Sequence, residues 1–494
     1  MPTSSVSPAP PLLSPARRRG SPAAQRAATS ERLQYVVLAL IVLGGLLLRL
    51  RYLREPMRWD EAATFQEYAR GSLGTIVSSY NRPNNQILYT LLEHLGIKTF
   101  GEGIAAVRLV AFAAGIAIVP ASFLAARRLY DGTAGLFAAA LTATFGPLVD
   151  YSVNGRGYTL GALFVVLSLW LGAVALDEGK RVAWAGFVLC SAAAIYTLPT
   201  MAIGVAAIAL WMAANAALER RWRFLLTLAG ALVAVGLLSL LLYSAVLGQR
   251  GWTAVTEAPR EWHSIKALAS AVWENWNRTA PHPFDWLVAA GFIAGVIRSA
   301  RLVAAFLVVL VGVALFAPIA PFVRSWLFLL PIYLIVAAGG LSWASRRFGP
   351  VMAVATAVAL AATFLNAGLK GSDVPPLSDN SIVPLLKRYV PKGHSVLIDR
   401  YVRAPTVYYY FERYGDPVKE TGLLRSADLR PGHIVVVTAK GTSPSETVYK
   451  AGGFASGDPR LLLKREWISF YDVPILRQAQ AHRLHYKGPN DRPQ

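Results

Sequence analysis

The sequence predicts a mainly α-helical, polytopic membrane protein with a small soluble α/β domain at its C-terminal end. Composition is the first indication: 54% of the 494 residues are hydrophobic and only 16% are charged, with a mean hydropathy of +0.42. A soluble domain of average makeup is about 45–50% apolar and about 25% charged. The chain therefore has too few charged residues to cover the surface of a large water-soluble fold.

Repeated apolar runs are the second indication, because each has the length of a membrane-spanning helix. About 20 residues at 1.5 Å each cross a hydrocarbon core of about 30 Å. The run from Leu33 to Leu53 is too long for the core of a signal peptide, and no small-residue cleavage site follows it. About eleven spans are expected in all, the others at about 103–124, 134–150, 158–176, 182–198, 200–216, 224–246, 285–297, 302–320, 323–342 and 350–367.

The net charge of +21, from 49 Lys and Arg against 28 Asp and Glu, predicts the orientation of these spans. Lys and Arg accumulate in the short cytoplasmic loops of membrane proteins. With the N-terminal tail in the cytoplasm, every basic short loop lies inside except the turn near Arg324. The charge excess thus has a source other than nucleic acid, and we expect no nucleic-acid partner.

This topology divides the chain into a tail, a membrane domain and an outer domain. The tail, 1–32, is rich in Pro, Ser, Ala and Arg without apolar periodicity, which predicts a disordered cytoplasmic segment. The membrane domain, 33–367, has two large outer loops at 54–102 and 248–284, whose Trp, Tyr, Pro and charges are typical of interfacial helices. The C-terminal domain, 368–494, lies outside. We expect the protein in the cell's inner (plasma) membrane.

The C-terminal domain is predicted to be a small α/β unit. Local patterns predict strands at Ser395 to Asp399, His433 to Thr438 and Glu466 to Val473, and helices at Pro405 to Tyr414 and Glu446 to Ala451. About 125 residues are enough for a small core. Because Cys190 is the only cysteine, intramolecular disulfides and cysteine-based metal clusters are excluded.

Two adjacent carboxylates, Asp60 and Glu61, follow the first span by a few residues and lie just outside the membrane surface. Adjacent side chains on a helix point about 100° apart, so the two cannot both approach one atom. We expect one to be the working group and the other its support. The alternative is a solvated pair at the start of an interfacial helix, where acids favour the N-terminal end of the dipole.

Two further stretches place polar groups on the same side of the membrane. Residues 80–89 put Arg82, two amides and a proline ahead of an apolar helix, and residues 150–158 put Arg156 between two glycines at the start of the fourth span. An arginine held near the bilayer boundary is costly unless it has an anionic partner. The alternative for Arg156 is that it snorkels into the lipid headgroups.

Together these stretches resemble the GT-C superfamily of polytopic glycosyltransferases, in particular the family 39 type that includes protein O-mannosyltransferases and aminoarabinose transferases of lipid A. The pattern stands here as Asp60-Glu61, then Asn84-Asn85-Gln86 with Leu88-Tyr89, then Tyr151-Ser152 and Gly155-Arg156-Gly157-Tyr158 with Leu160. The motifs cover roughly residues 33 to 176. Members often carry His at the position of Gln86, which cannot titrate and can only form hydrogen bonds.

The resemblance implies transfer of a sugar from a polyprenyl-phosphate carrier to a glycan, lipid or protein acceptor at the outer face. Asp60 is the expected base for the acceptor hydroxyl, with Glu61 as an orienting or acceptor-binding partner. Cations should hold the carrier phosphate, because guanidinium binds phosphate oxygens bidentately. The expected donor-binding residues, for phosphate or sugar, are Arg82, Asn85, Arg156, Tyr158, Arg58 and Arg324. The donor's apolar tail is expected in a groove between spans, among the membrane lipids.

No cofactor is required by these motifs. Some relatives in the superfamily use a divalent cation such as Mg²⁺ or Mn²⁺, but His263 and His282 on the second outer loop have no recognised metal-ligand spacing.

Two other functions fit the same topology. A flippase or transporter for a lipid-linked sugar would favour ionisable groups near the bilayer midplane, and the spans hold few of them. A ligase for preassembled glycans would depend more on Arg260 and His263 than on Asp60.

Overall fold

The computed structural model describes residues 22–55, 57–80, 85–251, 284–316 and 323–349 of the helical part. In the C-terminal part it describes 385, 388, 395–398, 409, 432–439, 443–450, 453–464 and 468–477. The expected span at 350–367 and the histidines His263 and His282 lie outside these residues.

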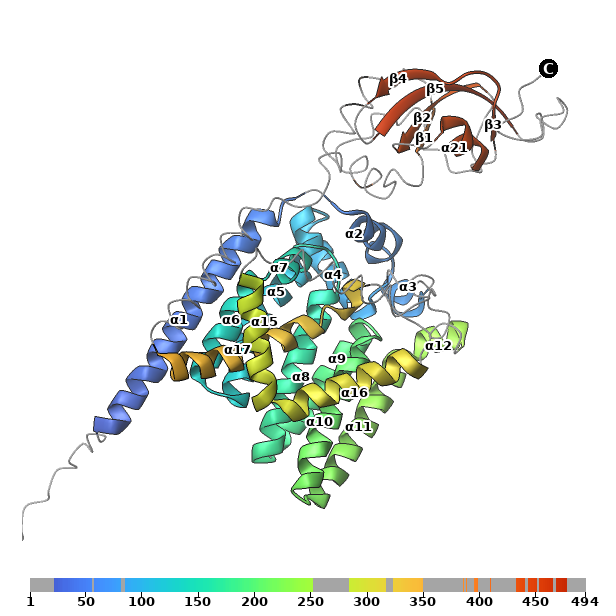
Figure 1. Ribbon diagram of the computed structural model, residues 1–494. Helices are drawn as coiled ribbons and strands as arrows, with labels where there is room; N and C mark the ends of the chain where they lie inside the picture. Colours follow the sequence, from blue (N-terminus) through green and yellow to red (C-terminus); the bar gives the residue numbers. More distant parts are fainter. Residues whose placement is uncertain are drawn as a thin grey trace, which may run out of the picture.

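The described helices form a bundle of long helices, with short helices such as α2 and α7 gathered at one end (Figure 1). They are α1 (Pro22–Tyr52), α2 (Trp59–Thr64), the π-helix η1 (Phe65–Ala69), α3 (Leu73–Ser78), α4 (Ile87–Phe100), α5 (Ile104–Leu129), α6 (Gly132–Thr144), α7 (Gly146–Ser152), α8 (Tyr158–Glu178), α9 (Arg181–Thr197), α10 (Met201–Leu218), α11 (Trp222–Leu242), α12 (Ser244–Arg250), α15 (Phe284–Arg298), α16 (Ala300–Phe316), the 3₁₀ helix η2 (Val323–Trp326) and α17 (Leu329–Phe348).

Six of the described helices are long and apolar enough to cross a membrane: Glu31–Tyr52 within α1, and α5, α8, α10, α11 and α17. The pairs α6 with α7 and α15 with α16 meet the same criteria only together, and their bends of 60° and 103° give up to eight spans in the described part. The expectation of a polytopic helical protein is confirmed. The two spans expected at 285–297 and 302–320 are instead two helices of 15 and 17 residues that meet at a sharp angle.

Helix α1 begins at Pro22, ten residues before the expected end of the tail. Its first turns, PAAQRAA, are composed mostly of good helix formers, and Pro is favoured at the first helical position because its missing N–H would have no partner there.

The third span is broken at Phe145, where the backbone is extended (φ −68°, ψ 122°). Gly146-Pro147 follows, and Pro147 cannot donate a hydrogen bond to the preceding turn. Arg49 of α1 satisfies carbonyl groups at the buried end of α6, donating to those of Ala143 at 2.8 Å and Thr142 at 3.4 Å. The break turns α7 so that its C-terminal end leads into the segment that carries Arg156.

The C-terminal part holds the strands β1 (Ser395–Ile398), β2 (Gly432–Ala439), β3 (Gly453–Ala455), β4 (Arg460–Lys464) and β5 (Ile468–Arg477), with the helix α21 (Pro444–Lys450). Their order is β1-β2-β5-β3, and β4 also pairs with β5. The β1–β2 pair is parallel, and all pairs with β5 are antiparallel. Three strands and α21 match the predicted elements, whereas β3 and β4 were not predicted. Of the helix expected at 405–414, only Tyr409 is described.

Side chains of β2 alternate between two cores, as the two-residue period of a strand requires. Ile434 and Val436 pack with Val448 of α21, whereas Val435 and Val437 belong to a second cluster. That second cluster also contains Ala62 and Phe65 of α2 and η1, together with Tyr409.

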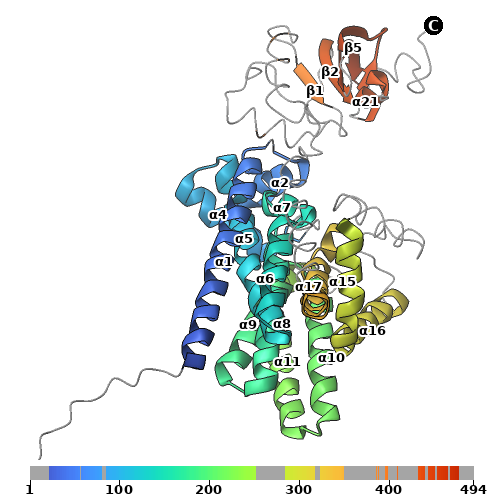
Figure 2. The same cartoon turned by 60° about the vertical axis from the view of Figure 1, so that its left-hand side comes forward.

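Tyr409 joins the C-terminal part to the helices that follow the first span. Its ring packs edge-on against Phe65 with centroids 5.3 Å apart, and its hydroxyl donates to the carbonyl of Glu102 at 2.9 Å. Both views show the sheet beyond the end of the bundle that carries α2, α4 and α7 (Figures 1 and 2). We call this the outer end, and the end where α5 finishes and α6 begins the inner end.

Candidate active site at the outer end

The two adjacent carboxylates lie in the first turn of α2 and have different surroundings. Glu61 is fully buried, while the side chain of Asp60 is 23% exposed. Glu61 accepts a hydrogen bond from the backbone N–H of Arg58 at 2.6 Å, which caps the start of the helix. The prediction was that one of the two is the working group and the other its support, and the two carboxylates differ in exposure.

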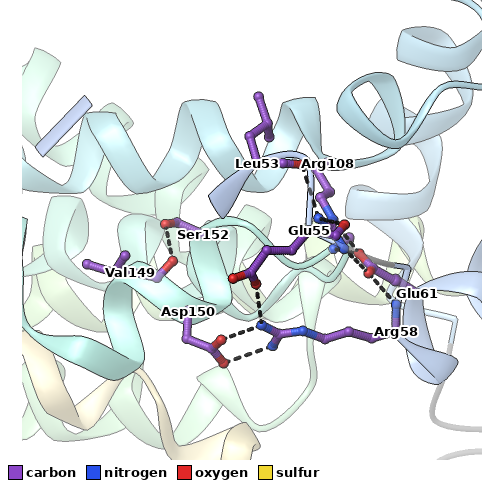
Figure 3. Close-up of polar contacts among 9 residues, drawn as sticks. Leu53, Glu55, Arg58, Glu61, Arg108, Val149, Asp150 and Ser152 are labelled. Carbon is purple, nitrogen blue, oxygen red and sulfur yellow. Dashed lines mark hydrogen bonds and ion pairs between the residues drawn. The ribbon is translucent and has the colours of Figure 1, made fainter. Parts of the chain in front are cut away.

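Glu61 forms a fully buried ion pair with Arg108 of α5 (Figure 3). Arg108 Nε donates to Glu61 Oε2 at 3.0 Å, and Nη2 donates to Oε1. Arg108 Nη1 also donates to the carbonyls of Leu53 and Glu55 at 3.0 and 2.7 Å. Glu61 Oε2 accepts a further bond from the N–H of Gly155 at 2.6 Å. The pair thus joins the end of α1, α2, α5 and the segment before α8.

Arg58 is bound to Asp150 of α7 by two hydrogen bonds, one of them 2.9 Å long, and Glu55 lies 3.9 Å away (Figure 3). Burial lowers the pKa of Arg58, but the charge and hydrogen bonds of Asp150 outweigh it and leave the pKa above its usual value. Arg58 was a candidate for the carrier phosphate. The structure places it in a bidentate pair that fixes the chain after α1 to α7.

Asp60 pairs with Arg324 of η2, whose Nη1 lies 2.8 Å from Asp60 Oδ2. The two side chains are 23% and 27% exposed, so the pair lies at the edge of the buried region. Arg324 was singled out because its turn is the basic short loop that the sequence places on the outer side of the membrane. The structure brings Arg324 next to Asp60, the predicted base, although the two residues are 264 positions apart in the sequence.

Arg156 is buried, with 1% exposure, and lies against the same helix. It donates to three neutral oxygens: the hydroxyl of Thr64, the carbonyl of Asp60 at 3.4 Å and the hydroxyl of Tyr158 at 3.4 Å. Burial lowers the pKa of Arg156, whereas Tyr158 and Asp60 raise it above its usual value. The guanidinium therefore stays charged.

The ring of Tyr158 lies close to two cations. The guanidinium carbon of Arg156 is 5.5 Å from the ring centroid, and that of Arg324 is 6.0 Å from it. Tyr80 lies nearby; burial, followed by the neighbouring Tyr158, raises its pKa to about 12. Two arginines and the ring of Tyr158 thus gather beside Asp60.

Asn85 and Gln86 lie at the start of α4 and are both 1% exposed. Asn85 Nδ2 donates to the carbonyls of Ile76 and Ser79 at 2.8 and 2.6 Å, which closes the turn after α3. Gln86 Oε1 accepts the N–H of Gly157. Arg82, a further candidate, lies outside the described residues.

Three residues of this region were not predicted. Arg108 and Thr64 contact the predicted groups directly, and Glu93 of α4 is fully buried with neither carboxyl oxygen hydrogen-bonded among the described residues. The sequence could have identified Arg108, because burying a charged residue within an apolar run costs free energy unless the residue has a partner. Thr64 and Glu93 have no comparable signal in the sequence.

No group of three or more His, Cys, Asp or Glu side chains that could hold a metal ion occurs within the part of the chain that the structure describes.

Comparisons with known proteins agree with this architecture. Residues 83–248 match the family described as dolichyl-phosphate-mannose-protein mannosyltransferase. A sequence search finds no match among the curated proteins. Among solved structures, apo ArnT from Cupriavidus metallidurans matches with a TM-score of 0.59 and 15% identity, over 90% of this chain and 98% of that one.

Two further matches are weaker. ArnT from the same organism bound to undecaprenyl phosphate gives a TM-score of 0.44 at 14% identity, over 90% and 98% of the chains. The oligosaccharyltransferase of Archaeoglobus fulgidus gives 0.46 at 14% identity, over 82% and 68%. The fold of this chain is that of ArnT. The family match over residues 83–248 agrees with the resemblance predicted from the sequence motifs.

Proposed function

We propose that the protein transfers a sugar from a polyprenyl-phosphate carrier to an acceptor hydroxyl at the outer membrane face. The observation that carries the proposal is the position of Asp60, a partly exposed carboxylate beside two arginines at the outer end of the bundle. The match of residues 83–248 to a family of dolichyl-phosphate-mannose transferases supports a lipid-phosphate donor. ArnT, whose apo form shares the fold, has also been solved with undecaprenyl phosphate.

The proposed chemistry is a one-step displacement at the anomeric carbon. The acceptor oxygen forms a bond to that carbon while Asp60 takes the hydroxyl proton. The bond between the carbon and the phosphate oxygen breaks, and the electron pair leaves with the phosphate. The leaving phosphate needs positive charge rather than a proton, so Arg156 and Arg324 suffice as its neighbours, with Arg82 as a further candidate. No step is assigned to a metal ion, and inversion at the sugar carbon follows from a single displacement.

Asp60 is suited to this role and Glu61 is not. Every oxygen of Glu61 is occupied by Arg108 and by backbone N–H groups, and its side chain is fully buried. Asp60 is reachable from solvent, and a phosphate that attracts Arg324 would release its carboxylate for the acceptor. Glu61 thus supports the site through its packing.

We infer that the protein lies in the cell's inner (plasma) membrane, with its outer end on the side away from the cytoplasm. Basic residues gather at the opposite end: Arg127 and Arg128 close α5, Arg181 opens α9, and Arg346 and Arg347 close α17. Lys and Arg favour the cytoplasmic side. The N-terminus is then cytoplasmic and the C-terminal sheet extracytoplasmic, where a glycan, lipid or protein acceptor is available.

The substitution Asp60→Asn tests the mechanism, because an amide cannot accept the hydroxyl proton. Cells that lack the gene are complemented with wild type, with Asp60→Asn or, as a control, with Glu67→Gln at an exposed side chain of the neighbouring helix η1. Mass spectrometry of glycans and glycolipids should show the transferred sugar with wild type and with the control only. General base catalysis contributes about 10²–10⁴-fold, so residual transfer should be at most about 1%.

Binding of undecaprenyl phosphate to purified Asp60→Asn should remain within about threefold of wild type, because the arginines are unchanged. Near-normal sugar transfer by this variant would reject Asp60 as the base. A lipid flippase would give that result, since flipping needs no base.

A further inference from the structure

The segment between α7 and α8 carries Arg156 and is held on both sides by side chains from other helices. The N–H of Gly155 donates to Glu61 Oε2 of α2 at 2.6 Å. The N–H of Gly157 donates to Gln86 Oε1 at the start of α4. Arg156 therefore lies between two fixed backbone positions.

The packing around this segment leaves no free space at either glycine. A Cβ atom on Gly157 would lie 2.8 Å from Tyr89 Cβ and 2.9 Å from Thr197 Cγ2. A Cβ atom on Gly155 would lie 3.0 Å from Glu61 Cβ. Helices α2 and α4 thus approach the backbone of this segment directly, and the hydrogen bonds to Glu61 and Gln86 set its position between them.

The two acceptors differ in charge. Glu61 is neutralised by Arg108, whereas the amide of Gln86 is uncharged and 1% exposed. An amide oxygen accepts a hydrogen bond at any pH, whereas an imidazole accepts one only on the nitrogen that carries no proton and on neither once it is protonated. A carboxylate would accept the same bond but would add a negative charge beside Arg156.

We propose that Gln86 is a positioning residue for donor binding: through Gly157 it holds the guanidinium of Arg156 in place for the carrier phosphate. The inference rests on the proposed function, because it takes Arg156 as the phosphate partner. The neutral amide gives a pH-independent acceptor that does not compete with phosphate for the arginine. Gln86 acts through Arg156 and does not touch the reacting atoms.

The test compares three substitutions in the full-length protein in nanodiscs, with undecaprenyl phosphate as the binding probe. Gln86→Met removes the acceptor and should weaken binding about tenfold. Gln86→Glu keeps the bond to Gly157 but attracts Arg156, and should also weaken binding. Gln66→Met makes the same chemical change on η1 and should leave binding unchanged.

Gln86→His gives a signature that a merely structural role would not produce. Binding relative to wild type should be near normal at pH 8 and should fall through the imidazole pKa, about 6.5 in an unperturbed side chain. The titration of the lipid phosphate itself cancels, because wild type is measured at each pH. A ratio that stays constant from pH 5.5 to 8 would overturn the inference.

Arg156→Ala separates the two levels of the argument. If Arg156→Ala binds the lipid phosphate as wild type does, the assignment of Arg156 in the proposed function is wrong. If Arg156→Ala weakens binding and Gln86→Met does not, only the role of Gln86 is wrong. Should Gln86→Met fail to fold, the pH profile of Gln86→His still decides the question.

Discussion

The polar cluster at the outer end of the bundle differs from the one at the inner end in how its charges are used. At the inner end, Asp131 caps α6 by accepting the N–H of Ala134 at 2.9 Å, and it also accepts from Ser342 and pairs with Arg346 of α17. Each of these groups closes a helix end or joins two helices, and Arg346 is 58% exposed. Capping helix ends and joining helices therefore explain every contact described for the inner cluster.

At the outer end the arginines Arg108 and Arg156 are fully buried or nearly so. Arg108 faces a buried carboxylate, but Arg156 donates to the neutral oxygens of Thr64, Asp60 and Tyr158. Burying charged groups is costly unless hydrogen bonds and nearby opposite charges compensate them. The two clusters therefore differ in burial, because the outer arginines lie inside the protein whereas Arg346 at the inner end is largely exposed.

The largest expected effect comes from Arg108→Met, which leaves Glu61 buried without its partner. Removing one member of a buried ion pair costs about 3–5 kcal/mol. The midpoint of thermal unfolding of the purified protein should fall strongly, and Glu61→Gln in the same chain should recover part of the loss. A midpoint equal to wild type would show that Arg108 and Glu61 are not a structural pair.

Arg156→Ala should leave the fold largely intact and weaken undecaprenyl-phosphate binding by about 10- to 100-fold, since a charged hydrogen bond contributes about 1.5–3 kcal/mol. Isothermal titration in nanodiscs would measure it. An equal loss in Arg346→Ala would remove the distinction between the two clusters.

Glu93→Gln should change the pH dependence of stability. Burial, and then the charge of Glu61, raises the pKa of Glu93 well above its usual value, while Arg156 opposes this. The folded protein therefore holds a proton that the unfolded chain loses near pH 4.3, and stability falls as pH rises above that value.

The amide of the glutamine variant has no carboxyl proton that unfolding could release. Its unfolding midpoint should therefore decline less than that of wild type between pH 5 and 8. Parallel curves for the two proteins would show that Glu93 does not carry the proton.

The smallest effect is expected for Arg346→Ala at the inner end. Exposed ion pairs contribute about 0–1 kcal/mol, so the unfolding midpoint should shift only slightly and lipid-phosphate binding should not change. A large loss of binding would show that the inner cluster is coupled to the outer site.

The parts of the fold that depend on local pattern were predictable from sequence. Apolar length identified the spans that form α1, α5 and α8, and the bias of basic residues identified Arg324 as an exception. Asp60 and Arg324 meet in the structure, as a common outer site requires.

The partners of buried charges were not predictable, because they depend on tertiary distances. Arg108 lies in an apolar run 47 residues from Glu61, and nothing local connects them. The break at Phe145 was missed because Gly146-Pro147 lies inside a run with the right length for one straight span. Strands β3 and β4 were missed because three and five residues are too few to show a clear alternation.

The bond between Arg49 and the end of α6 has a consequence for the biogenesis of the chain. The acceptors of Arg49 outside its own helix, Ala143 and Thr142, are synthesised 94 and 93 residues after it. These two hydrogen bonds can therefore form only after α6 has been synthesised, so the contact between the first and third spans is completed after the second span has been made.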